Sequence, residues 1–176
     1  MLAFDGPSGS GKSTAAVEAL SLLGPRAALV TTDAFATWTS PVSWWPELVS
    51  GVLEPLAAGR SGSYQRMDWS TGVPRPGARV AVEVPEVLVL EGVSCGRRSV
   101  RPLLSLLCWV EGGTEAERLA SAVARDGEAH RAELRKWQLF ERGWFAVDGT
   151  RDAAGARLPG AARLPGVAEP ADAPLS

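Results

Sequence analysis

The chain has 176 residues, of which 45% are hydrophobic and 22% are charged, and this balance predicts one globular domain rather than a largely disordered chain. Its 18 Lys and Arg residues against 20 Asp and Glu residues give a net charge of −2, which offers no overall attraction to nucleic acid or to an acidic membrane surface. The two cysteines, Cys95 and Cys108, have neither disulfide-framework nor metal-site spacing, so we expect buried or incidental thiols in a reducing compartment rather than a functional pair.

The first predicted element is a short buried strand over residues 2–4, followed directly by the sequence GPSGSGKST at 6–14. A glycine, four residues and then Gly-Lys-Ser is the spacing of the phosphate-binding (Walker A) loop. Its glycines let successive backbone N–H groups converge on an anion, and a helix, here predicted over 13–23, begins behind them. The residues expected to hold phosphate are Gly6, Ser8, Gly9, Ser10, Gly11, Lys12, Ser13 and Thr14.

Apolar runs and helical patterns alternate along the rest of the chain. The predicted strands are 27–31, 87–90 and 106–110, and the predicted helices are 44–58, 100–104, 114–125 and 128–145. Strands that alternate with helices indicate the α/β class, with a parallel sheet covered by helices on both faces in a three-layer sandwich.

The composition changes near residue 148. Beyond it Ala, Gly, Pro and Arg dominate, ARLPG occurs at 156–160 and again at 162–166, and no aromatic residue follows Phe145. We therefore predict a domain over 1–148 and a flexible tail over 149–176 that adds little to the core from about residue 155 onward.

Two carboxylates stand where predicted strands end. Asp33 follows the run 27–31 and Glu91 follows 87–90. Because ligands of open α/β sheets bind at the carboxyl ends of the strands, we expect both to face the phosphate-binding loop. One could accept the proton of an attacking hydroxyl, while the other, with Ser13, could hold Mg²⁺. The structural alternatives are a turn or N-cap role for Asp33 and a solvated strand-end role for Glu91.

The sequence resembles the uridine kinase-like branch of the P-loop nucleoside and small-metabolite kinases over roughly residues 1–148. The matching segments are GPSGSGKST, TDAF at 32–35, YQRMDW at 64–69, VLVLEGV at 87–93 and ERLASAVARDGE at 117–128. The resemblance implies a P-loop NTPase fold and the phosphorylation of a hydroxyl group on a small molecule, with ATP and Mg²⁺ as cofactors.

The resemblance also implies site residues. Asp33 matches the catalytic base, Lys12 the phosphate-binding lysine, and Ser13 and Glu91 the metal-associated positions. Arg118 and Arg125 match arginines of the segment that closes over the phosphates, where their charge could neutralise the transferring group. The alternative is that both are surface arginines on one face of a solvated helix.

The chain departs from the family pattern in two segments. Ser121, Ala122 and Val123 separate Arg118 from Arg125, although Arg131 and Arg135 could substitute in closing the site. Tyr64, Asp68 and Trp69 match the family's substrate-recognition segment, but they lead into STGVP instead of a histidine and an arginine. These three residues are candidates for binding the acceptor through a carboxylate and a stacking ring, and the identity of the acceptor stays open.

Several aromatic residues have alternative interpretations. The segment that carries Tyr64, Asp68 and Trp69 could instead be a short edge strand with one of its aromatic rings in the core. Trp38, Trp44 and Trp45 could form a lid over the acceptor or pack in the core, and His130, between acidic and basic residues, is expected to be a solvated helical residue.

Three classes of function remain to be compared. A GTPase would need an Asn-Lys-x-Asp motif to recognise guanine. The chain contains no asparagine, which argues against this class. A nucleoside monophosphate kinase of the cytidylate type and a non-catalytic ATP-binding regulator stay open as alternatives to the small-molecule kinase. With no signal peptide and no apolar stretch of membrane-spanning length, we expect a cytoplasmic protein with neither a membrane nor a nucleic-acid partner, whose oligomeric state the sequence does not set.

Overall fold

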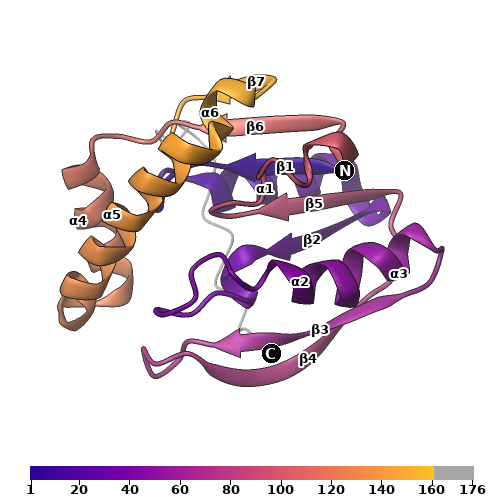
Figure 1. Ribbon diagram of the computed structural model, residues 1–176, viewed down its shortest axis with the longest axis horizontal. Helices are drawn as coiled ribbons and strands as arrows, with labels where there is room; N and C mark the ends of the chain where they lie inside the picture. The colour runs from indigo at the N-terminus through magenta and orange to yellow at the C-terminus, as the bar shows by residue number, and fades with distance from the viewer. Residues whose placement is uncertain (161–176) are drawn as a thin grey trace.

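The computed structural model describes residues 1–160, which form a central sheet of five parallel strands in the order β2-β5-β1-β6-β7 (Figure 1). The strands are β1 (Leu2–Asp5), β2 (Ala27–Thr31), β5 (Val87–Glu91), β6 (Leu106–Val110) and β7 (Ala156–Leu158). Since neighbouring strands are parallel, their carboxyl ends meet at one edge of the sheet, which confirms the predicted α/β architecture.

The two faces of the sheet pack against different layers. On one face α1 (Lys12–Leu23) covers Phe4, Val89 and Cys108, with Ala16 of the helix fully buried between them. On the opposite face, alternate strand residues such as Leu88 and Leu90 belong to a second hydrophobic cluster. This alternation follows from the two-residue period of a strand and lets a single sheet serve two cores.

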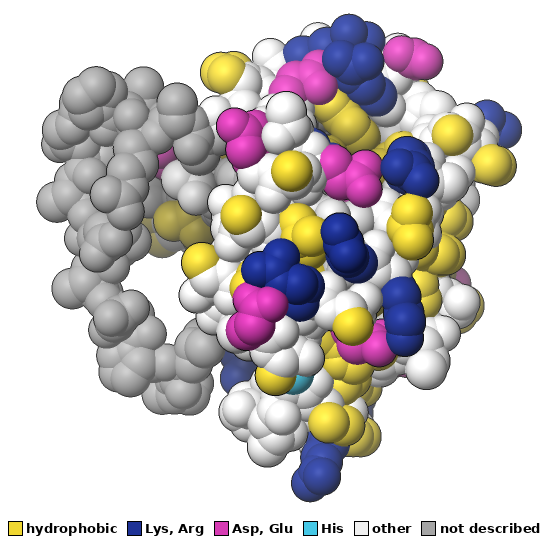
Figure 2. Space-filling view, turned by 90° about the vertical axis from the view of Figure 1, so that its left-hand side faces the viewer, with side chains coloured by type: hydrophobic (Ala, Val, Ile, Leu, Met, Phe, Trp, Pro, Cys, Tyr) yellow, Lys and Arg dark blue, Asp and Glu magenta, His cyan; other side chains and the backbone are white. Residues whose placement is uncertain are grey.

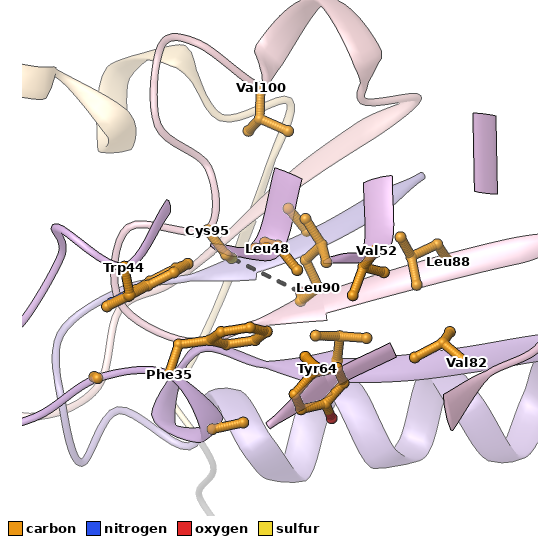
Figure 3. Close-up of a cluster of buried hydrophobic side chains, with 14 of the residues drawn as sticks. Phe35, Trp44, Leu48, Val52, Tyr64, Val82, Leu88, Leu90, Cys95 and Val100 are labelled. Carbon is orange, nitrogen blue, oxygen red and sulfur yellow. Dashed lines mark hydrogen bonds between the residues drawn. The ribbon is translucent and has the colours of Figure 1, made fainter. Parts of the chain in front are cut away.

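The second cluster is built mainly from the segment between β2 and β5 (Figure 3). Its helical part consists of α2 (Trp45–Leu48), a π-helical turn (Val49–Leu53) and α3 (Glu54–Ala57), where we predicted one helix over 44–58. Phe35 stacks on Trp44 with ring centroids 5.5 Å apart and lies 4.7 Å from the ring of Tyr64. Tyr64 is therefore a core residue, as the edge-strand interpretation proposes.

An antiparallel hairpin, β3 (Gly62–Asp68) with β4 (Arg75–Val82), completes this layer and forms a separate two-stranded sheet. We did not predict β4. Its sequence, RPGARVAV, contains a proline and a glycine that weaken a strand pattern, and most of its residues are exposed.

Beyond the carboxyl ends of the strands lie α4 (Glu115–Asp126) and α5 (Arg131–Asp148), on the left of Figure 1. Thr114 and Glu117 form a capping box that starts α4, and the two helices pack through Leu119, Val123 and Leu134. On the face that they present, Lys and Arg side chains lie interspersed with Asp and Glu (Figure 2). None of the helices in residues 1–160 is long and apolar enough to cross a membrane.

The connection between β5 and β6 carries a short 3₁₀ turn, Arg101–Leu103, in place of the predicted helix over 100–104. Both cysteines are free and buried, as the sequence predicts: Cys95 in this connection and Cys108 in β6. The Cys95 thiol donates to the carbonyl of Leu90, as the dashed line in Figure 3 shows.

The predicted boundary at residue 148 needs correction, because residues 149–160 belong to the fold. They form α6 (Thr150–Ala153) and β7, which pairs with β6 at the edge of the sheet. Thr150 is 0% exposed and donates to Asp148, and Leu158 packs against the α1 side of the sheet. The remainder of the predicted tail, 161–176, lies outside the described residues.

Truncation after Gly155 should therefore destabilise the protein. It removes β7, including the half-buried Leu158 and the bond that the Leu158 carbonyl accepts from the backbone amide of Glu111. We expect a loss of roughly 1–3 kcal/mol in the free energy of unfolding, measured by urea denaturation. Truncation after Gly160 is the control, since the difference between the two variants isolates residues 156–160. Equal stability of the two would show that β7 contributes nothing.

Candidate functional site

The phosphate-binding loop connects the carboxyl end of β1 to the start of α1 and fits closely against its neighbours. Gly6 and Gly9 both have positive φ angles, +147° and +76°. A Cβ at Gly6 would lie 2.4 Å from the carbonyl oxygen of Val110, and one at Gly9 would lie 2.8 Å from that of Arg118. Only glycine satisfies both the backbone conformation and the available space at these positions.

The start of α1 has the properties of an anion site. Gly11 is its N-cap residue, no side chain of the described residues caps it, and Ser13 and Thr14 lie exposed in its first turn. The Lys12 ammonium is buried and donates to the carbonyl of Pro7 at 3.0 Å. The hydroxyl of Ser10 is buried without a hydrogen-bond partner in residues 1–160. Unpaired helix amides, a lysine and an orphan hydroxyl together fit a phosphate group.

Asp5, at the end of β1, is a site residue that we did not predict. It is completely buried, and its carboxylate accepts bonds from the amides of Gly6 (2.7 Å), Ser94 (3.1 Å) and Gly96 (2.8 Å). Burial raises the pKa of Asp5 to about 6, although these amides and Lys12 lower it. Asp5 therefore fixes the phosphate-binding loop to the connection that follows β5.

Ser13 and Glu91 meet beside the loop, as predicted. The Ser13 hydroxyl donates to Glu91 Oε1 at 3.3 Å, and Glu91 is buried. Burial raises the pKa of Glu91 to about 7; the charge of Lys12 opposes this shift, while that of Asp33 adds to it. Residues 1–160 contain no group of three His, Cys, Asp or Glu side chains arranged to hold a metal. One hydroxyl and one carboxylate do fit Mg²⁺, which keeps several waters and takes other ligands from phosphates.

A cavity of about 710 Å³, named here the acceptor cavity, opens beside the loop. Its walls are Ser8, Asp33, Trp38, Trp69, Ser70, Thr71, Gly72, Arg125, Asp126, His130, Leu134 and Trp137. Four predicted functional residues therefore share this space: Ser8 of the loop, the carboxylate proposed as a base, Asp33, the aromatic residue Trp69 and the arginine Arg125. Its size is that of a site for a small molecule.

Trp38 is the centre of the aromatic wall of this cavity. Its ring lies edge-on to Trp69 (5.0 Å between centroids) and Trp137 (5.8 Å). The N–H groups of Trp38 and Trp69 donate to the carbonyls of Gly72 (2.9 Å) and Asp33 (3.0 Å). These two hydrogen bonds fix the orientation of both indoles, and they engage N–H groups that could otherwise donate to a ligand.

His130 also lines the acceptor cavity. It stacks on Trp38 and touches Gly72, where a Cβ would lie 2.2 Å from the imidazole. His130 is therefore partly rather than fully exposed, because the hairpin tip at Gly72 packs against it, and it ends a 3₁₀ turn (Glu128–His130).

Two of the proposed acceptor-binding residues do not line the acceptor cavity. Tyr64 is in the core. Asp68 is exposed, and its carboxylate accepts the amide of Ser70 at 2.8 Å, a bond that lowers the pKa of Asp68. Asp68 thus stabilises the turn that places Trp69 in the cavity wall.

The two predicted arginines lie at different cavities. Arg125, in the acceptor cavity, forms two bonds to Asp126, at 2.6 and 2.7 Å. Arg118 lines a second cavity of about 430 Å³, together with Pro7, Glu141 and Phe145, and donates to the carbonyl of Gly113. The structure does not bring the two guanidinium groups to one place.

Trp44 and Trp45 surround a buried arginine, Arg97, instead of forming a lid. The guanidinium of Arg97 lies 5.0 Å from the ring of Trp44, 4.5 Å from Trp45 and 5.2 Å from Trp144. Burial lowers the pKa of Arg97 to about 10, and Asp5 and Asp148 oppose the shift. Of the three tryptophans considered as a lid, only Trp38 lies at the acceptor cavity.

Comparison with solved structures shows the same fold in two proteins that are described as a possible and a putative kinase. The structure of a possible uridine kinase from Bacillus stearothermophilus matches with a TM-score of 0.62 and 15% identity, over 89% of this chain and 86% of that one. A putative fructose transport system kinase from Silicibacter sp. TM1040 matches with a TM-score of 0.58 and 21% identity, over 90% and 88%. No protein-family model and no curated protein matches the sequence. The chain therefore shares its α/β fold, and the order of its elements over most of its length, with these two structures.

Proposed function

We propose that this chain is an ATP- and Mg²⁺-dependent phosphotransferase that moves the γ-phosphate to a hydroxyl group of a small molecule. The observation that carries the proposal is the meeting of the phosphate-binding loop, the Ser13–Glu91 pair and Asp33 beside one cavity. The fold shared with structures described as kinases supports it.

Each residue would have a distinct role. The amides at the start of α1 and Lys12 would hold the phosphates, and Ser13 and Glu91 would hold Mg²⁺, which supplies positive charge to the phosphate oxygens. Asp33 would accept the proton of the acceptor hydroxyl as its oxygen attacks phosphorus. Arg125 lies on the same cavity as Asp33, where its charge could stabilise the transferring group.

The charges of the acceptor cavity favour an acceptor that carries no phosphate. Apart from His130, its ionisable side chains are two carboxylates, Asp33 and Asp126, and one guanidinium, which Asp126 already binds. A nucleoside monophosphate would need unpaired cations around its phosphate. The aromatic wall instead suits an apolar or ring-shaped body.

The proposal is tested by measuring ADP release in a coupled assay across nucleosides, nucleotides and small alcohols. We expect turnover with an unphosphorylated hydroxyl compound. Turnover with a nucleoside monophosphate alone would favour the cytidylate-type kinase. Normal ATP binding without any acceptor would favour an ATP-binding regulator.

Replacing Lys12 with alanine should weaken ATP binding at least tenfold, or about 1.4 kcal/mol. Lys12 is the loop's cation, and without it the triphosphate is bound by amides and hydroxyls alone. Isothermal titration calorimetry measures the effect, and Lys136→Ala, at an exposed lysine of α5, is the control for the loss of one charge. Equal affinity of K12A and the parent would contradict a nucleotide site at this loop.

A further inference from the structure

A buried carboxylate from α5 already binds the phosphate-binding loop. Glu141 is 2% exposed, its Oε2 accepts the amide of Ser8 at 3.0 Å, and its Oε1 accepts the Ser8 hydroxyl. Burial raises the pKa of Glu141, while the charge of Lys12 and the two bonds from Ser8 oppose that shift. In its ionised form, Glu141 thus occupies two hydrogen-bond donors of the loop.

The Ser8–Glu141 contact separates the two cavities. Ser8 lines the acceptor cavity, whereas Glu141 lines the second cavity. One turn before Glu141, Trp137 lies in the wall of the acceptor cavity, and one turn after it, Phe145 lies in the wall of the second. A displacement of α5 at Glu141 would therefore alter both cavities.

The chemistry of this contact resembles that of a bound phosphate. A carboxylate that accepts an amide and a hydroxyl uses the donors that a phosphate oxygen would use. The Lys12 ammonium is likewise engaged within the loop, at the carbonyl of Pro7. A triphosphate entering the loop would meet the negative charge of Glu141 at short range, in surroundings that screen it poorly.

We propose that Glu141 is a positioning residue that competes with nucleotide phosphates for the phosphate-binding loop. Nucleotide binding releases Ser8 from Glu141, and the freed part of α5 shifts the Trp137 wall of the acceptor cavity. Occupancy of the loop is thereby coupled to the shape of the acceptor site. This inference rests on the proposed nucleotide site but not on the identity of the acceptor.

The test is the direction in which ATP affinity changes in E141Q. The amide keeps the size of the side chain and one oxygen acceptor but removes the charge. Competition predicts that MgATP binds E141Q about five- to tenfold more tightly than the parent, by calorimetry. E133Q is the matched control, because Glu133 is a more exposed glutamate of the same helix, paired with Lys136. Its affinity should equal that of the parent.

Unchanged or weaker MgATP binding in E141Q would overturn the inference, because that is the result expected if the Ser8–Glu141 contact only stabilises the loop. A parent chain that binds no MgATP would overturn the proposed function itself. If E141Q does not fold, E141D keeps the charge but shortens the reach to Ser8, and tighter binding is again expected. Amide hydrogen exchange over residues 137–145 should rise in the parent when MgATP binds, and unchanged or reduced exchange would contradict the release of α5.

Discussion

Replacing Asp33 with asparagine is expected to reduce turnover of the acceptor by about 10²- to 10⁴-fold, while MgATP still binds. Asparagine keeps the size and much of the hydrogen bonding of the side chain but cannot accept the hydroxyl proton. Asp33 is exposed at the acceptor cavity, and its backbone carbonyl is held by Trp69, so the substitution should leave the cavity intact. The measurements are ADP release with the acceptor found by screening and ATP affinity by calorimetry.

Asp126→Asn is the matched control for charge in the same cavity. It removes one negative charge and one partner of Arg125 but leaves Asp33 in place, so its loss of turnover should be smaller than that of D33N. If D33N retained nearly the turnover of the parent, Asp33 would not be the base. If the two variants lost turnover equally, the charge of the cavity rather than proton transfer would be the cause.

Replacing Glu91 with glutamine is expected to raise the Mg²⁺ concentration needed for half-maximal activity by about 10- to 100-fold. An amide is a poorer ligand or outer-shell acceptor than a carboxylate for a hard cation. Glu91 reaches Ser13 directly, so the effect should appear in the metal titration rather than in ATP affinity without metal. An unchanged Mg²⁺ requirement would remove Glu91 from the metal site.

The pH dependence of the Mg²⁺ requirement is a second test of the role of Glu91 in binding the metal. Because the pKa of Glu91 is raised to about 7, the carboxyl is protonated as the pH falls below that value. The Mg²⁺ requirement of the parent should therefore rise from pH 8 to pH 6, since Mg²⁺ and the proton compete for the same group. The requirement of E91Q should already be high at pH 8 and change little.

The parts of the fold that the sequence predicts correctly are those with strong local signals. The loop at 6–14 combines a fixed spacing with a strand before it and a helix after it. The strand that leads to Asp33 and the strand that ends at Glu91 are largely apolar runs. By contrast, β7 is only three residues, in an Ala-, Gly- and Arg-rich segment. It is a strand because β6 offers an unpaired edge, which is a tertiary effect.

The site residues likewise divide into those that local sequence predicts and those that only the tertiary structure brings together. Arg118 and Arg125 are seven residues apart and share a helix face, but seven residues span about 10 Å of helix, enough to place the two at different cavities. Asp5 could have been found by the argument used for Asp33 and Glu91, since it also ends a strand. Glu141 gives no such signal, because its partner Ser8 is 133 residues away in the chain.

Strand β7 also affects whether copies of this protein can pair through an exposed edge of the sheet. Without it, β6 would expose the backbone of LLCWV, a five-residue apolar edge of the kind that pairs with other chains and leads to aggregation. With it, the edge on that side of the sheet in residues 1–160 is only three residues long and carries an arginine, Arg157. Very short, charged edge strands are a common protection against such pairing. The few residues after α6 therefore serve the solubility of the molecule as well as its stability.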